Sequence, residues 1–319
     1  MARLAQISTQ SGVEQPDARI VAYAPLPIQP SSPSWTVNLA IGAVLGAILF
    51  AIVALLKQVF AVGVGSPEEV ETMFGVAFLA AIPRLRGVDI TIVNQVVEEP
   101  ASPYAESIRA LAAGLFSPGQ EQPKVVAITS PQASEGKTTT AIALGRSQAL
   151  RGRRVLVIDC DLQRPIFRPR FGFGQSGPGL VEALRKEARL ADCLADDPLT
   201  SARFLPAGQS IEPGQSVPFE ELEALIEEAR GRFDLIVLDL PPVLQVAETR
   251  VLAAASDGVV LLTRWKHTSR QAIEFAVTIL ARAGNPLLGL ALMEVPAGSQ
   301  IMVGSYSESA VGKLRLGGA

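Results

Sequence analysis

The sequence predicts an α/β fold in which a parallel sheet is covered by helices on both faces and follows one transmembrane helix. Two observations lead to this prediction. Short and almost entirely apolar runs alternate with amphipathic helical segments between residues 124 and 295. Ahead of them lies an uncharged run at residues 36–56, in which Asn38 is the only strongly polar residue. At about 1.5 Å per residue this run spans roughly 30 Å, the thickness of the hydrocarbon core of a bilayer.

The segment before this run is polar at first and then proline-rich. Residues 1–35 include Pro25, Pro27, Pro30 and Pro33, a spacing that favours a stiff and extended chain leading to the membrane. A buried core helix is one alternative for residues 36–56, but core helices rarely stay uncharged over such a length. A secretory signal peptide is another, but it would begin near residue 1 with a basic region. We therefore expect a membrane span.

The strand and helix predictions of the main domain follow the alternation in order. Five apolar, mostly β-branched or leucine-rich runs predict strands, at residues 124–130, 153–161, 233–242, 257–265 and 286–295. Four amphipathic or small-residue runs predict helices, at residues 101–116, 137–152, 218–233 and 268–284. We expect a cytoplasmic connector at 57–100, the main domain at 101–296, and a flexible tail at 297–319 that is rich in Gly and Ser.

Overall composition excludes several classes of function. Charged residues make up 18% of the chain and the net charge is −3, so nothing indicates nucleic acid as a partner. Cys160 and Cys193 give no disulfide framework, which suits a reducing compartment. The single histidine, His267, argues against a His-based metal site and against Ser–His catalysis.

The stretch "SPQASEGKTTTA" follows the first strand of the main domain and precedes a helix. Its second half fits the phosphate-binding P-loop pattern, although Pro131 stands where the first glycine belongs. Backbone amides and the helix N-terminus would hold phosphate oxygens, Lys137 would neutralise the β/γ charge and the Thr138 hydroxyl would bind Mg²⁺. We expect ATP contacts from all of Ser134, Glu135, Gly136, Lys137, Thr138 and Thr139.

Two further predicted strands have aspartate residues at or near their ends. Asp159 and Asp161 are two residues apart at the end of "VLVIDCDLQRP", so both point to one face, whereas Cys160 points to the other. Two neighbouring carboxylates repel unless a cation is near, and Mg²⁺ beside a nucleotide supplies one. Arg164 follows closely and is placed to hold phosphate or to pair with a carboxylate. Asp239 ends the run "LIVLD", the position from which a carboxylate binds Mg²⁺ directly or through water.

These three signals fall in order at the ends of predicted strands, where open α/β sheets bind ligands. The fold class is therefore a P-loop NTPase-type sheet with one transmembrane helix before it. Because a nucleotide site must face the cytoplasm, residues 57–319 are expected inside the cell. The predicted metal ligands are Thr138, Asp159 and Asp239, and the predicted catalytic residues are Lys137, Asp159, Asp161 and Arg164.

At this point the chain resembles the bacterial tyrosine kinases, the cytoplasmic domains of polysaccharide chain-length determinant proteins. "SEGKTTTA", "VLVIDCDLQRP" and "FDLIVLDLPPV" resemble that family's Walker A, A′ and B motifs, and "APLPIQPSSP" resembles its Pro-rich segment before the second membrane helix. "ETMFGVAFLAAIP" is similar to its connector, and "ESIRALAAGL" to the helix that packs its kinase domains into a ring. The resemblance covers nearly the whole chain.

The resemblance implies an ATP- and Mg²⁺-dependent protein-tyrosine kinase that phosphorylates itself and regulates exopolysaccharide or capsule chain length or export. It implies a bacterial inner-membrane location, a homo-oligomeric ring formed through helix 102–116, and polysaccharide polymerase and export proteins as partners. Residues 1–35 would then be the end of a periplasmic domain. Asp159 or Asp161 would orient or deprotonate a tyrosine hydroxyl supplied by a neighbouring subunit.

The sequence also departs from the family pattern. Ser134 replaces a glycine, Ala112 replaces the second arginine of the ring-packing helix, and Leu240 replaces a Ser or Thr after Walker B. Met293 stands where related ATPases have an Asn that meets the adenine, and the tail holds only Tyr306 where the family has a tyrosine cluster. Two alternatives stay open: a nucleotide-binding regulator of the same machinery that is not a kinase, and a partitioning or cell-division ATPase. The latter usually has an early lysine in Walker A, which "SPQASEGK" lacks.

Overall fold

The computed structural model describes residues 23, 34–59, 63–85, 87, 89–117, 122–174, 177–209, 218–297 and 299. These residues fall into two units, Met1–Phe60 and Ala61–Ala319. Tyr306 and the rest of the expected tail beyond residue 299 lie outside the described residues, as does most of the Pro-rich segment.

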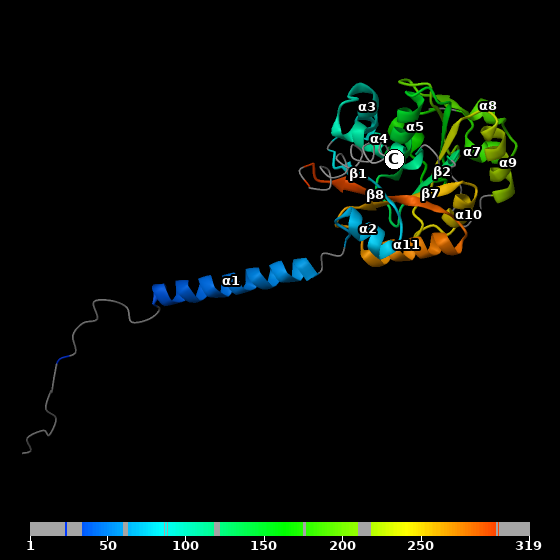
Figure 1. Cartoon of the computed structure of the whole chain (residues 1–319). Coiled ribbons are helices and arrows are strands. Elements are labelled where there is room, and N and C mark those ends of the chain that lie inside the picture. The colour runs from blue at the N-terminus through cyan, green and yellow to red at the C-terminus, as the bar shows by residue number, and fades with distance from the viewer. Residues whose placement is uncertain are drawn as a thin grey trace, which may run out of the picture. The chain divides into compact units, whose positions relative to one another are not determined.

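The first unit contains helix α1 (Trp35–Val59), shown in blue in Figure 1. Within it, Trp35–Val53 has a mean hydropathy of 2.4. No other helix in the described part of the chain combines the length and apolar composition needed to cross a membrane. The helix covers the predicted run 36–56 and begins one residue earlier, at the tryptophan.

The second unit is built on a single sheet of eight strands within the described residues. Their spatial order is β1-β8-β7-β2-β6-β3-β5-β4, and all neighbours are parallel except β4 and β5. The strands are β1 (Phe78–Pro83), β2 (Val125–Thr129), β3 (Val155–Asp159), β4 (Ala195–Asp196), β5 (Arg203–Leu205), β6 (Leu235–Asp239), β7 (Gly258–Arg264) and β8 (Leu287–Val295).

Helices cover both faces of this sheet (Figure 1). One face packs against α3 (Asp89–Glu98), α4 (Pro103–Leu115), α5 (Lys137–Ala149) and α6 (Phe167–Phe171). The other packs against α2 (Pro67–Phe74), α7 (Leu180–Leu184), α8 (Leu190–Cys193), α9 (Phe219–Arg230), α10 (Thr249–Ala254) and α11 (Arg270–Arg282). The predicted α/β class with helices on two faces is confirmed.

Local sequence explains why these elements begin where they do. The Ser102 hydroxyl accepts the Ala105 N–H at 3.2 Å and Pro103 follows it, so Ser102 is the N-cap of α4, within the predicted helix 101–116. The strands β2, β3 and β6 are buried along their whole length, as near-continuous apolar runs at the centre of a parallel sheet must be.

Two features differ from the sequence expectations. The segment 57–100, expected as a connector, contributes α2, α3 and the strand β1, which pairs with β8. The compact unit therefore extends well before residue 101. The sheet is also not purely parallel, because the short edge strand β4 runs antiparallel to β5. Neither edge strand is among the five predicted strands, and each is defined by its pairing with a neighbouring strand.

Candidate active site

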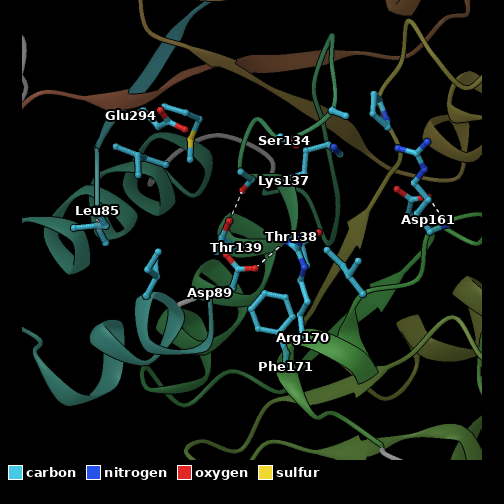
Figure 2. A pocket seen from close by; sticks show the side chains of 18 of the residues that line it. Leu85, Asp89, Ser134, Lys137, Thr138, Thr139, Asp161, Arg170, Phe171 and Glu294 are labelled. Atoms are coloured by element: carbon cyan, nitrogen blue, oxygen red, sulfur yellow. Dashed lines mark hydrogen bonds and ion pairs between the residues drawn. The ribbon is translucent and has the colours of Figure 1, made fainter. Parts of the chain in front are cut away.

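The candidate site lies at the carboxyl ends of the central strands β2, β3 and β6. It is a cavity of about 540 Å³ next to the start of α5 (Figure 2). Lys137, Thr138 and Thr139 reach it from the first turn of α5, Asp161 from beyond β3, and Leu85 from beyond β1. A parallel sheet brings all its carboxyl ends to one edge, which is why motifs far apart in sequence converge here.

The loop between β2 and α5 has the backbone geometry of an anion site. Gly136 caps α5 with a φ of 83°, and no side chain caps this helix. The first amides of a 13-residue helix are therefore available to a phosphate. A Cβ added here would lie 2.6 Å from the Met293 methyl carbon, so the flexible end of the Met293 side chain would have to shift.

Ser134 occupies a left-handed conformation, with a φ of 62°. The glycine that the family has at this position suits such a conformation, whereas Ser134 carries a Cβ into it. A non-glycine residue in this region costs about 1–2 kcal/mol. The loop therefore keeps its shape against a local strain, and Ser134 still lines the cavity as predicted.

Glu135 turns away from the cavity. Its side chain is buried, one carboxylate oxygen accepts the Gln132 N–H at 2.8 Å, and the other accepts the Thr268 hydroxyl. Burial raises the pKa of this carboxyl, and the bond from Thr268 works against that rise. Glu135 therefore stabilises the loop and does not line the cavity. The other five predicted nucleotide contacts do line it: Ser134, Gly136, Lys137, Thr138 and Thr139.

Thr138 and Asp239 form the part of the site that best fits a cation. The Thr138 hydroxyl donates to Asp239 Oδ2 at 2.5 Å, and Asp239 Oδ1 is buried without a hydrogen-bond partner among the described residues. Burial raises the pKa of Asp239 to about 7, and the nearby Lys137 charge opposes the rise. An unpaired buried carboxylate oxygen beside a hydroxyl is a hard oxygen donor set, which Mg²⁺ prefers.

The residues present fit Mg²⁺ only together with a nucleotide. Within the described residues, no group of three or more His, Cys, Asp or Glu side chains gathers in a way that would hold a metal. Mg²⁺ at nucleotide sites commonly takes one or two protein ligands, with phosphate oxygens and waters completing the octahedron. Thr138 and Asp239 would supply those protein ligands.

Asp159 and Asp161, predicted as a pair, have different surroundings. Asp159 pairs in register with Asp239 on the neighbouring strand β6. Its oxygens accept the backbone N–H groups of Asp161 at 3.2 Å, and of Ile166 and Phe167 at 3.3 Å each. Burial and then the Asp239 charge raise the pKa of Asp159. Asp159 therefore closes the turn after β3 and does not line the cavity.

Asp161 does line the cavity, together with Arg164. Burial raises the pKa of Asp161, and the positive charge of Lys137 counteracts this. The Arg164 backbone N–H donates to Asp161 Oδ1 at 3.2 Å, which fixes the carboxylate at the cavity edge. Asp161 is thus the only one of the two predicted acid–base candidates that faces the space where a substrate would bind.

The structure adds residues that the sequence reasoning missed. Arg170 Nη1 lies 2.9 Å from Asp89 Oδ2, and this ion pair lines the cavity with Phe171 (Figure 2). Leu85 and the buried Tyr104 complete an apolar wall opposite the loop. Asp89 and Arg170 are 81 residues apart, so only the docking of α3 against α6 brings them together. The one sequence signal for Arg170 and Phe171 as cavity residues was the basic and aromatic run "RPRF", which follows closely after Asp161.

Comparison with known proteins agrees with this geometry. Residues 123–283 match the model of the AAA domain family. A tyrosine-protein kinase of Bacillus subtilis (strain 168), YwqD, is 31% identical over 198 residues, which covers 60% of this chain and 81% of YwqD. The chain belongs to the bacterial tyrosine kinase family.

Other members of the bacterial tyrosine kinase family match beyond the AAA domain. The succinoglycan biosynthesis transport protein ExoP of Rhizobium meliloti (strain 1021) is 26% identical over 97% of this chain, but the chain spans only 43% of ExoP. The solved kinase domain of the Escherichia coli tyrosine kinase ETK superposes with a TM-score of 0.67 at 25% identity. The superposition covers 74% of this chain and 97% of the ETK domain. This match confirms the P-loop NTPase-type fold of the second unit.

Asp239→Asn should raise the Mg²⁺ concentration needed for half-maximal nucleotide turnover by about tenfold or more, because a neutral amide is a poorer Mg²⁺ ligand. Nucleotide binding without Mg²⁺ should change little, since the loop amides and Lys137 remain. A Mg²⁺ titration of ATP turnover measures the effect. Asp234→Asn is the matched control, because Asp234 directly precedes the same strand at its other end. Identical Mg²⁺ curves for Asp239→Asn and wild type would rule out Asp239 as a ligand.

Proposed function

We propose that the chain is a membrane-anchored, ATP-binding tyrosine autokinase that regulates exopolysaccharide or capsule chain length or export. The observation that carries the proposal is the Thr138–Asp239 hydrogen bond beside an unpaired buried carboxylate oxygen, next to Lys137 in a phosphate-binding loop. Membership of the family and the similarity to the tyrosine-protein kinase YwqD support the reaction, and the similarity to the succinoglycan biosynthesis transport protein ExoP supports the polysaccharide role.

The geometry supports a phosphoryl transfer in which the protein mainly positions groups and neutralises charge. The amides after Gly136 and the Lys137 ammonium would hold the β- and γ-phosphates. Mg²⁺, when bound, offsets the charge that develops on the phosphate oxygens. A tyrosine oxygen forms the new bond to the γ-phosphorus as the bond to the β–γ bridging oxygen breaks, and ADP leaves with that electron pair. The hydroxyl proton goes to Asp161.

Asp161 is favoured over Asp159 for this role because only Asp161 lines the cavity. Both oxygens of Asp159 already accept backbone N–H groups. Arg164 lines the same edge and would attract the transferred phosphate. The apolar wall at Leu85 and Phe171 leaves room for the nucleoside part of ATP.

Location and assembly belong to the same proposal. Helix α1 would span the bacterial inner membrane, with residues 57–319 in the cytoplasm and residues 1–35 on the periplasmic side. The chain would form a homo-oligomeric ring through helix 102–116 and act with the polysaccharide polymerase and export proteins. Glu106 and Arg109 on this helix form a partly exposed ion pair within the chain, while Ala112 is buried. Any charged contact between subunits would therefore come from Glu106 and Arg109.

A nucleotide-binding regulator without kinase activity is the second candidate, and the tyrosines favour it. The chain has three: Tyr23, Tyr104 and Tyr306. Tyr104 is buried, and Tyr23 would lie on the periplasmic side. Tyr306 is then the one tyrosine expected to reach a neighbouring site, whereas the family carries a cluster.

Incubation of the full chain in detergent micelles with Mg²⁺ and labelled ATP tests the choice. We expect weak autophosphorylation, mapped by mass spectrometry mainly to Tyr306, and we expect Tyr306→Phe to remove most of it. Tyr23→Phe is the control and should leave incorporation unchanged. If the wild type hydrolyses ATP without incorporating phosphate, the regulator becomes the better assignment. If incorporation is undiminished in Tyr306→Phe, another residue is the acceptor.

A further inference from the structure

The residues that follow α1 in sequence pack against the turn after β7. Gly63 forms an antiparallel bridge with Ser269, and the Lys266 N–H donates to the Val64 carbonyl at 2.9 Å. The Trp265 indole N–H donates to the Gly65 carbonyl at 3.1 Å. We call residues 63–65 the docking segment and residues 264–269 the β7 turn. Three successive residues of the docking segment are thus hydrogen-bonded or bridged to the β7 turn.

The two segments approach too closely for a side chain at the first of these residues. A Cβ on Gly63 would meet the backbone of Lys266 and lie 2.6 Å from the His267 nitrogen. Lys266 itself has a φ of 51°, and its ammonium lies 4.6 Å from the centre of the Trp265 ring. The β7 turn is therefore held in an uncommon backbone conformation while the docking segment lies against it.

The far side of the same turn holds the phosphate-binding loop. The Thr268 hydroxyl accepts the Arg264 N–H at 2.9 Å and donates to the Glu135 carboxylate. Thr268 is fully buried, and the other Glu135 oxygen accepts the Gln132 N–H. Glu135 stands between two residues with left-handed backbone, Ser134 and Gly136. The carboxylate that Thr268 holds therefore ties together a loop in which the neighbouring backbone is strained.

We propose that Thr268 is a positioning residue for the phosphate-binding loop, and that the docking segment, by holding the β7 turn, raises the affinity of that loop for nucleotide. The proposal rests on the proposed nucleotide-binding function. Thr268 acts through Glu135 and lines no part of the cavity. A loop already fixed in its binding conformation loses less conformational freedom when phosphate binds, so its affinity is higher.

Linkage makes the effect reciprocal. If the docking segment strengthens nucleotide binding, nucleotide must stabilise the docking segment by the same factor. Because the segment follows α1 closely in sequence, this contact is where a change in the membrane-proximal chain would be felt by the site. Nucleotide should then slow hydrogen exchange in residues 63–69 as well as in residues 131–137.

The test uses the full chain in detergent micelles and Mg-ADP as the probe, with the dissociation constant measured by calorimetry. Thr268→Val keeps the side-chain shape and removes the hydroxyl, so we expect binding to weaken by about 10- to 100-fold, the range for a lost hydrogen bond to a charged group. Thr268→Ser keeps the hydroxyl and should bind within about threefold of wild type. Trp265→Phe removes the indole N–H and part of the ring, keeps an aromatic side chain, and should weaken binding by a smaller factor.

Thr200→Val is the matched control. The Thr200 hydroxyl also donates to a carboxylate, Asp197 Oδ2 at 2.6 Å, but this bond does not reach the loop. Thr200→Val should lower the unfolding temperature without changing the dissociation constant for Mg-ADP. If Thr268 had only a structural role, Thr268→Val would show the same result. Equal affinity in wild type, Thr268→Val and Trp265→Phe would overturn the inference and leave the proposed function standing. A wild type that does not bind Mg-ADP at all would overturn the proposed function itself.

Discussion

Replacement of Lys137 by alanine should lower ATP turnover by at least about 100-fold, the scale seen when a donor aimed at developing charge is removed. Lys137 is nearly buried at the start of α5, and its charge acts on both Asp161 and Asp239. Without it, only the loop amides would oppose the negative charge of the phosphates and of Asp161, which lines the cavity. Steady-state ATP turnover and nucleotide binding by calorimetry are the measurements.

Lys124→Ala is the matched control for this change. Lys124 precedes β2, at the end of the strand opposite the phosphate-binding loop, and it does not line the cavity. The Lys124→Ala substitution removes the same charge from the chain and should leave ATP turnover near the wild-type value. If Lys137→Ala also binds and turns over ATP as the wild type does, the assignment of this loop to phosphate binding is wrong.

Arg146→Met should destabilise the second unit by about 3–5 kcal/mol, the cost of leaving a buried charge without its partner. Arg146 lies in the last turn of α5 with its side chain fully buried, and its Nη2 is 2.8 Å from Asp197 Oδ1. A second bond joins Nε to Asp197 Oδ2 at 3.1 Å, and Nη1 donates to Asn94 at 2.7 Å. The methionine would leave Asp197 with only the bond from Thr200. Thermal and denaturant unfolding of the full chain in micelles measure the loss.

Two further variants separate the ion pair from simple packing. Arg146→Met combined with Asp197→Leu removes both charges and should recover much of the lost stability, because buried pairs replaced by apolar residues are often neutral. Arg154→Met breaks an exposed pair with Asp234 and should leave the unfolding midpoint almost unchanged. An Arg146→Met protein as stable as the wild type would show that Asp197 is solvated or neutral in the fold.

The sequence predicted a site residue best where a single strand or helix fixes the position of that residue. A P-loop pattern directly before a helix requires a glycine at the helix start, and Gly136 is the cap of α5. Asp239 could be placed at a strand end because the four residues before it are apolar and lie in one run. Its partner Thr138 follows from the motif, and the two are hydrogen-bonded across 101 residues of sequence.

The prediction was weakest where two residues with the same chemistry were assigned the same role. Asp159 and Asp161 are alike in sequence, and alternation along a strand places both on one face. The turn that follows β3 gives them different surroundings, because its amides donate to both Asp159 oxygens while Asp161 lines the cavity. Glu135 and Ser134 likewise needed the folded loop, in which one points away and the other adopts positive φ.

By itself the sequence determined the central elements and the order of the site motifs, because apolar periodicity and strand-end carboxylates are local properties of the chain. It determined the long apolar helix, the central strands and the phosphate-binding loop in this way. The tertiary structure alone decided which distant residues meet: β1 beside β8, Asp89 beside Arg170, Arg146 with Asp197, and Thr268 behind Glu135. These contacts depend on how helices dock on the sheet, and docking is a property of many residues packed together.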